Sequence, residues 1–247
     1  MNPLRGRLAG RIRRQALTLG RLACRLRRRL DPACIHDLRV LTRRLRAAVW
    51  LGRALAPEKP FDPARRLLRK LGRCLGARRA LDVAASDAVA HGLNPARLEP
   101  LRAAAGKAVE RRLSPVRQRR VLAALETAAR ALRHAGDAPD RLARALDRHA
   151  RRLGVALARA GRSHAALHRL RIQAKKVRYV LEALGRDGDF LRPLQRRIGR
   201  AHDLDVMQSL LGAHPRAAGS AHRARKAARR MMHGVVRRAL ARLEASL

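Results

Sequence analysis

The sequence HDLRVLTRRLR at residues 36–46 returns later in the chain as HRLRIQAKKVR at residues 168–178. In both copies, apolar and basic residues recur at the three- and four-residue spacing of an amphipathic helix. We therefore expect two helices, each with an aliphatic side that is buried and a basic side that is not. The aliphatic sides are Leu38, Leu41, Leu45 and Val49 in the first copy, and Leu170, Ala174, Val177 and Leu181 in the second.

The basic sides form two narrow rows, because positions i, i+3, i+7 and i+10 lie along one stripe of a helix. We name them the first file (His36, Arg39, Arg43 and Arg46, flanked by Arg44) and the second file (His168, Arg171, Lys175 and Arg178, flanked by Lys176). A solvated helix face usually mixes charges of both signs, whereas neither file contains a carboxylate. Like charges on successive turns destabilise a helix unless an anion covers them. The spacing therefore predicts an anion-binding site, with a merely solvated basic face as the alternative.

A second pair of shared blocks follows in the same order. Leu75-Gly76 and Leu81-Asp82-Val83 correspond to Ile198-Gly199 and Leu204-Asp205-Val206. Repeated blocks in one order indicate an internal duplication, and we place its halves at residues 1–135 and 136–247. Asp82 and Asp205 are expected to be structural partners that orient arginines of the files, since a carboxylate in the site would repel an anion. Asp203 of the second half is matched by Ala80, so any ion pair of Asp203 has no counterpart in the first half.

The chain reads as all-α, because Ala, Leu and Arg favour helices and the residues typical of strands are scarce. Asp31-Pro32, Asp62-Pro63, Asn94-Pro95 and Ser114-Pro115 are typical helix starts, in which a capping side chain precedes proline. Ser163 is expected to cap the second copy as Asp31 caps the first. We expect helices at roughly 3–30, 32–55, 62–90, 95–112, 115–134, 139–160, 164–184, 189–211 and 216–245.

The charge of the chain indicates what class of partner it binds. The 247 residues carry 59 Lys and Arg against 18 Asp and Glu, a formal charge of +41. Such an excess favours a polyanion as the partner. The planar guanidinium group of arginine can donate two parallel hydrogen bonds to phosphate oxygens. The three cysteines, Cys24, Cys34 and Cys74, lack metal-ligand spacing and are expected to be small buried residues in a reducing compartment. We expect no metal, no cofactor, no membrane span and a cytoplasmic location.

The two files and the L-G and L-D-V blocks together resemble the CHAD family, the conserved-histidine α-helical domain, over nearly the whole chain. The resemblance implies two helical bundles related by pseudo-twofold symmetry, with a basic central cavity or groove. It also implies binding of long-chain inorganic polyphosphate, often in granules, without catalysis. The E-x-E-x-K signature of a neighbouring triphosphate-tunnel domain is absent from this sequence, so the chain resembles a stand-alone copy.

Two other functions compete with this hypothesis. Basic helices bind nucleic acids on charge alone, although the only aromatic residues are Trp50, Phe61, Tyr179 and Phe190, too few for a base-stacking platform. His202-Asp203 is similar to the His-Asp pair of metal-dependent phosphohydrolases, but the first copy of the repeat has Arg79-Ala80 at the matching positions.

The polyphosphate hypothesis also predicts a pH dependence. Protonation of His36 and His168 near their ordinary pKa would add positive charge, so we expect tighter binding as the pH falls from about 7.5 to 5.5.

Overall fold

The structure is a computed structural model that describes residues 3–135 and 139–245. Over these residues it contains nine α-helices, three short 3₁₀ helices and no strand, which confirms the all-α fold class. The α-helices are α1 (Pro3–Arg28), α2 (Pro32–Leu55), α3 (Asp62–Ala90), α4 (Glu99–Arg112), α5 (Pro115–Arg133), α6 (Pro139–Arg159), α7 (His164–Leu184), α8 (Arg192–Leu211) and α9 (Pro215–Glu244). The 3₁₀ helices are η1 (Lys59–Phe61), η2 (Pro95–Leu98) and η3 (Asp189–Leu191).

The chain forms two compact units. The first contains the chain up to Asp82 and the segment Glu99–Leu142; the second contains Val83–Leu98 and the chain from Ala143 onward. The predicted break near Gly136 lies among residues 136–138, outside the described part of the chain. The units differ from the predicted halves chiefly in segment 83–98, which belongs to the second unit.

The reason for that difference is an apolar cluster. Ala84, Ala85, Ala88 and Leu98 are buried against residues of α8 and α9, namely Leu204, Met207, Ala217 and Ala221. Burial of this surface favours keeping the end of α3 and η2 with the second unit. A sequence repeat cannot reveal such packing, because alanines at helical spacing do not identify the helix that covers them.

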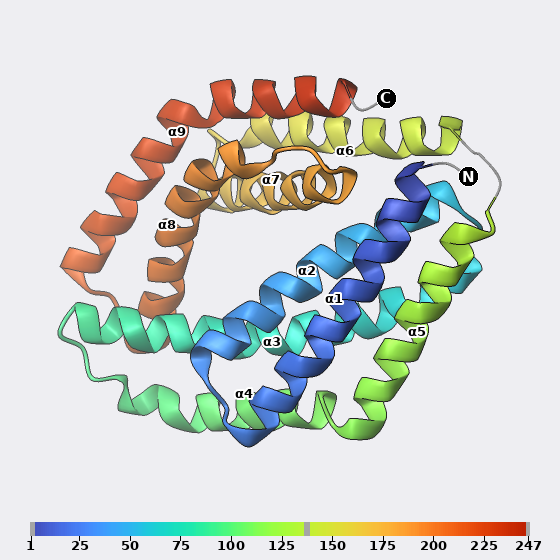
Figure 1. Ribbon diagram of the computed structural model, residues 1–247. Helices are drawn as coiled ribbons and strands as arrows, with labels where there is room; N and C mark the ends of the chain where they lie inside the picture. Colours follow the sequence, from blue (N-terminus) through green and yellow to red (C-terminus); the bar gives the residue numbers. More distant parts are fainter. Residues whose placement is uncertain (1–2, 136–138, 246–247) are drawn as a thin grey trace. The chain divides into compact units, whose positions relative to one another are not determined.

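In the first unit, α1 lies alongside both α2 and α5 (Figure 1). The predicted aliphatic side of α2 is buried: Leu38 and Leu45 are fully inaccessible, and Leu41 and Val49 nearly so. Burying four such side chains contributes on the order of 1.5–3 kcal/mol each before conformational entropy is counted. This burial fixes the rotation of α2 about its axis and therefore the direction in which its basic side points.

In the second unit, α8 lies alongside α9 and α7 (Figure 1). The predicted aliphatic side of α7, Leu170, Ala174, Val177 and Leu181, is completely buried. Both copies of the quoted motif thus use the same side of the helix for the core.

Side-chain caps set the start of both helices. Asp31 Oδ1 and Oδ2 accept the backbone N–H groups of Ala33 and Cys34 at 3.1 and 3.2 Å, and Ser163 Oγ accepts that of Ala166 at 3.1 Å. The predicted cap at Asp62 is wrong, because η1 runs directly into α3 and makes Asp62 a helical residue. Ser114 stands at the cap of α5 without a capping hydrogen bond from its side chain.

The three cysteines were predicted to be buried, and the structure agrees only in part. Cys34 is buried and Cys74 is half-buried, but Cys24 is exposed, contrary to expectation. Within residues 3–135 and 139–245, no helix combines the length and the apolar character that a membrane crossing requires.

Candidate functional site

The first file lies on the side of α2 opposite its buried leucines. His36, Arg44 and Arg46 are exposed, and Arg39 and Arg43 are half-buried. Partial desolvation, followed by the charges of Arg43 and Arg69, lowers the pKa of Arg46, which shows that cations crowd this part of the surface. The structure therefore brings all five predicted residues of the first unit to one accessible side of one helix.

The second file lies on α7 and is more enclosed. His168, Arg171 and Lys175 are half-buried, Lys176 is exposed, and Arg178 is buried. Burial, followed by the charge of Lys176, lowers the pKa of His149 on α6 to about 4. Lys176 therefore contributes to the positive field within the second unit as well as at its surface.

Glycines of the repeated L-G block lie beside the file arginines. A Cβ at Gly76 on α3 would be 4.0 Å from Nε of Arg39, and a Cβ at Gly199 on α8 would be only 3.0 Å from Nη2 of Arg171. The same glycine thus stands against the same arginine in both units, with a much closer approach in the second. The close passage of the Arg171 side chain explains glycine at position 199, whereas the 4.0 Å distance at Gly76 would accommodate a Cβ.

Arg171 also faces a carboxylate. Its Nη2 is 3.8 Å from Oδ1 of Asp203 on α8. The matching residue of the first unit is Ala80, so position 80 supplies no carboxylate there. The two files therefore differ in local charge although their own residue types agree.

Arg178 departs most from the sequence expectation. Its Nη1 donates a hydrogen bond to Glu182 Oε1 at 3.1 Å and lies 4.0 Å from Asp189 of η3. Residues four apart on a helix are neighbours, and Glu182 lies just beyond the quoted motif. The expectation that the basic side of this helix is not buried is thereby corrected at Arg178. Arg178 is 8% exposed and is held inside the unit.

The histidines that head the files have different neighbours. The rings of His168 and His202 are 4.1 Å apart between centroids. Desolvation, followed by His202 and then Arg171, lowers the pKa of His168 from 6.5 to about 4. Desolvation, followed by Arg79, lowers the pKa of His36. His202 and Arg79 occupy matching positions of the repeat, so each unit places a basic side chain of the neighbouring helix close to the leading histidine.

These pKa shifts concern the unliganded protein, and the pH dependence of binding stays a prediction. His168 is neutral from pH 7.5 to 5.5 in the unliganded protein, and the shift of His36 has the same direction. The histidines therefore add less charge across that window than their ordinary pKa values imply.

Comparison with known proteins agrees with the resemblance to the CHAD family. The family model of the CHAD domain matches residues 12–212. This chain belongs to the CHAD domain family. Its fold is similar to the crystal structure of the CHAD domain from the plant Ricinus communis, with a TM-score of 0.68, 24% identity, and coverage of 96% of this chain and 91% of that one. It is also similar to PptA from Streptomyces chartreusis, with a TM-score of 0.58, 18% identity, and coverage of 97% and 98%. No curated protein matches the chain.

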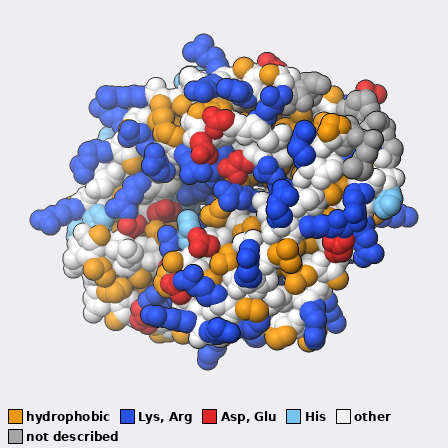
Figure 2. Space-filling view, viewed as in Figure 1, with side chains coloured by type: hydrophobic (Ala, Val, Ile, Leu, Met, Phe, Trp, Pro, Cys, Tyr) orange, Lys and Arg blue, Asp and Glu red, His pale blue; other side chains and the backbone are white. Residues whose placement is uncertain are grey.

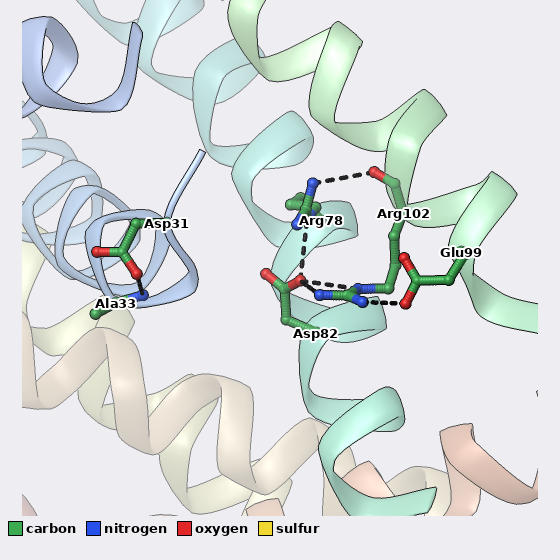
Figure 3. Close-up of polar contacts among 6 residues, drawn as sticks. All are labelled: Asp31, Ala33, Arg78, Asp82, Glu99 and Arg102. Carbon is green, nitrogen blue, oxygen red and sulfur yellow. Dashed lines mark hydrogen bonds and ion pairs between the residues drawn. The ribbon is translucent and has the colours of Figure 1, made fainter. Parts of the chain in front are cut away.

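The aspartates of the L-D-V blocks hold arginines in each unit of this CHAD domain. Asp82 Oδ1 accepts hydrogen bonds from Arg78 Nε at 2.9 Å and from Arg102 Nη2 at 3.3 Å, and Arg78 Nη1 donates to the backbone oxygen of Arg102 at 3.1 Å. Glu99 pairs with Arg102 on its other side (Figure 3). In the second unit, Asp205 accepts from Arg225 Nη1 at 2.9 and 3.0 Å. The arginines held here lie outside the two files, unlike those that the sequence suggested.

This second set of contacts extends the internal correspondence. In both units the arginine on the following helix stands twenty positions after the aspartate, Arg102 after Asp82 and Arg225 after Asp205. Asp82 is the more deeply enclosed, since its side chain is 2% exposed against 40% for Asp205. In this CHAD domain the repeated aspartates link consecutive α-helices through ion pairs with arginine.

Positive charge extends well beyond the files. Lys and Arg side chains are spread over the whole visible face of the molecule, with Asp and Glu scattered among them (Figure 2). One further concentration of positive charge is a pocket between α7 and α9, lined by His164, His222, Arg225, Lys226, Arg229 and Arg230. The sequence feature that indicates this pocket is the series His222, Arg225 and Arg229, which has the same spacing as His36, Arg39 and Arg43.

Proposed function

We propose that this CHAD domain binds long-chain inorganic polyphosphate through the cations of its two files, and that it does so without catalysis. The observation that carries the proposal is the first file: five basic residues, including His36, on one accessible side of α2, opposite a buried aliphatic side. The resemblance that led to the family also supports the choice of ligand.

The chemistry of the ligand suits this arrangement. Polyphosphate is a flexible chain of anionic groups without bases, so it requires positive charge and hydrogen-bond donors but no sequence reading. Guanidinium groups bind phosphate oxygens with paired, charge-assisted hydrogen bonds. Displacement of counterions from the polyanion adds a favourable term that decreases as the salt concentration rises. Spacing of the file cations along successive helical turns lets several phosphates of one chain be contacted together.

Nucleic-acid binding is the second candidate, favoured by the broad positive surface. The aromatic residues argue against it as the main function. Phe61 and Tyr179 are buried, Trp50 and Phe190 are half-buried, and the Phe190 ring is covered by the Arg238 guanidinium at 4.7 Å. Stacking of bases on exposed aromatic rings is a main source of affinity for single strands.

The surroundings of His202 and Asp203 likewise support a binding role. His202 packs against His168, and Asp203 faces Arg171. Both residues are thus engaged with the second file, where they shape its charge and position its side chains.

A competition experiment tests the proposal. Long-chain polyphosphate bound to the protein is challenged at physiological salt with duplex DNA at equal phosphate concentration. We expect DNA to leave most of the polyphosphate bound. Displacement of polyphosphate by an equal amount of DNA phosphate would contradict the proposal and favour nucleic-acid binding. Orthophosphate release by the purified protein, lost in His202→Ala, would contradict the non-catalytic part.

A further inference from the structure

The second unit contains a pocket that is separate from the predicted file residues. It has a volume of about 610 Å³ and lies between the start of α7 and the middle of α9. Its lining consists only of cationic and histidine side chains: His164, His222, Arg225, Lys226, Arg229 and Arg230. Five of these are exposed, whereas Arg225 is half-buried.

The residues on α9 reproduce the pattern of the files. His222, Arg225 and Arg229 stand at positions i, i+3 and i+7, as do His36, Arg39 and Arg43. These positions share one side of a helix. The core residues Ala221, Ala228 and Met232 lie on another side and are buried, so the core fixes the rotation of α9. A third basic row headed by histidine thus faces the pocket.

Two contacts give the pocket a defined geometry. Asp205 on α8 holds Nη1 of Arg225 with both carboxylate oxygens, at 2.9 and 3.0 Å, which leaves the other guanidinium nitrogens to contact a ligand. Ser163 caps α7 and makes His164 its first residue. The partial positive charge of a helix N-terminus therefore adds to the side-chain charges at that edge of the pocket.

The charge balance of the pocket favours an oxyanion. Four permanent cations line one cavity, and the carboxylate of Asp205 contacts one of them. Cations confined together repel one another, and an anion placed among them replaces that repulsion by attraction. Since Lys226, Arg229 and Arg230 are exposed, they can reach a ligand without any rearrangement of the core.

We infer that this pocket is an additional phosphate-binding site of the second unit, which takes consecutive phosphates of a condensed inorganic phosphate. The inference rests on the proposed function, because it extends the same ligand class to residues outside the two files. A long chain held at a file and at the pocket gains affinity from both contacts, as in any multivalent complex. A short chain such as inorganic triphosphate occupies the pocket alone.

The test compares two α9 variants of equal charge. The pocket variant is Lys226→Gln, Arg229→Gln and Arg230→Gln, which leaves Arg225 and its ion pair with Asp205 intact. The control variant is Arg216→Gln, Arg237→Gln and Arg242→Gln, three exposed residues of the same helix that stand at least six positions, about 9 Å along the helix axis, from its pocket residues. Binding of inorganic triphosphate and of long-chain polyphosphate is measured by calorimetry at several salt concentrations, after circular dichroism has shown that both variants keep their helix content.

For the pocket variant we expect an affinity for triphosphate at least about tenfold below wild type. We also expect the slope of log K against log salt for polyphosphate to fall by about 2, which corresponds to three lost phosphate contacts on a single-stranded polyanion. The control variant should change triphosphate affinity by less than about twofold, since charges beyond a Debye length of about 8 Å are screened. Equal effects of the two variants, with wild type still binding polyphosphate, would overturn the pocket alone. Displacement of polyphosphate from wild type by duplex DNA would instead overturn the proposed function.

Discussion

The files on α2 and α7 have the same residue pattern in different surroundings. On α2, Arg46 is exposed and position 80 of the neighbouring helix is alanine. On α7, the matching Arg178 is buried against Glu182, and Asp203 stands beside Arg171. A carboxylate that contacts a cation competes with an anionic ligand for it. The comparison teaches that the number of cations in a motif does not measure the charge available to a ligand.

The largest expected effect comes from neutralising matched positions of the two files. Arg39→Gln, Arg43→Gln and Arg44→Gln on α2 should weaken polyphosphate binding about 100-fold, which corresponds to about 3 kcal/mol. The matching triple, Arg171→Gln, Lys175→Gln and Lys176→Gln, should weaken it about tenfold, because Asp203 already offsets part of the charge of Arg171. Calorimetry at one fixed salt concentration measures both.

A charge-matched control decides whether position matters. Arg111, Arg119 and Arg120 are exposed on α4 and α5, two helices that carry neither file, and their replacement by Gln removes the same three charges. We expect this control to change affinity by less than about threefold under electrostatic screening. If it weakened binding as much as the α2 triple, net charge alone would explain the affinity and the first file would not be a site.

The next prediction compares how much Arg46 and Arg178 contribute to the free energy of unfolding. Arg178→Gln leaves Glu182, whose side chain is 16% exposed, without its cationic partner, and should lower the free energy of unfolding by about 2 kcal/mol. Arg46→Gln should change it by less than about 0.5 kcal/mol, as is usual for an exposed side chain. Denaturant titration measures both values.

The double variant Arg178→Gln, Glu182→Gln isolates the ion pair. It should recover much of the stability lost in Arg178→Gln, because no unpaired carboxylate remains. A double variant as unstable as the single one would show that packing of the Arg178 side chain, and not its charge, is what the unit requires.

A smaller effect distinguishes the two repeated glycines. Gly76→Ala should raise the free energy of unfolding by about 0.5–1 kcal/mol, because alanine is favoured over glycine within a helix and its Cβ meets Arg39 only at 4.0 Å. Gly199→Ala should lose that gain, because its Cβ would lie 3.0 Å from Nη2 of Arg171. Denaturant titration of both variants provides the comparison. Stabilisation of equal size at both positions would show that the closer approach of Arg171 has no energetic consequence.

The sequence predicted those features that depend on local periodicity. Helix boundaries agree closely with expectation, and the buried sides of α2 and α7 are the predicted ones, because apolar spacing and caps such as Asp31 act within one helix. The sequence could not predict which distant side chain meets a given residue. The Asp82–Arg102 ion pair, the packing of His168 against His202 and the burial of segment 83–98 in the second unit all depend on contacts between helices that no local pattern specifies. The burial of Arg178 escaped prediction for a simpler reason, since its partner Glu182 lies one turn beyond the repeated motif.

The smallest expected effect is on pH dependence, where the two leading histidines again differ. In the free protein His168 has a pKa of about 4, lowered by desolvation, His202, Arg171 and Lys175 and partly opposed by Asp203. As the pH falls from about 7 towards 4, the unfolded chain gains a proton at this position that the folded protein does not. The free energy of unfolding therefore falls with acidification. His168→Gln should make the decline shallower.

Binding should change in the opposite direction. A bound polyanion stabilises the protonated ring and raises its pKa, so the complex takes up protons at acidic pH. Polyphosphate affinity should vary by less than about twofold between pH 7.5 and 6.5 and increase a few-fold towards pH 5. His168→Gln should remove more of this increase than His36→Gln does. The nearby His202 helps to lower the pKa of His168 in the free protein, so ligand binding can raise the pKa of His168 more than that of His36. Calorimetry across this range in two buffers of different ionisation enthalpy measures the proton uptake directly. Equal uptake by wild type and His168→Gln would show that His168 stays neutral in the complex and that its role is to pack against His202.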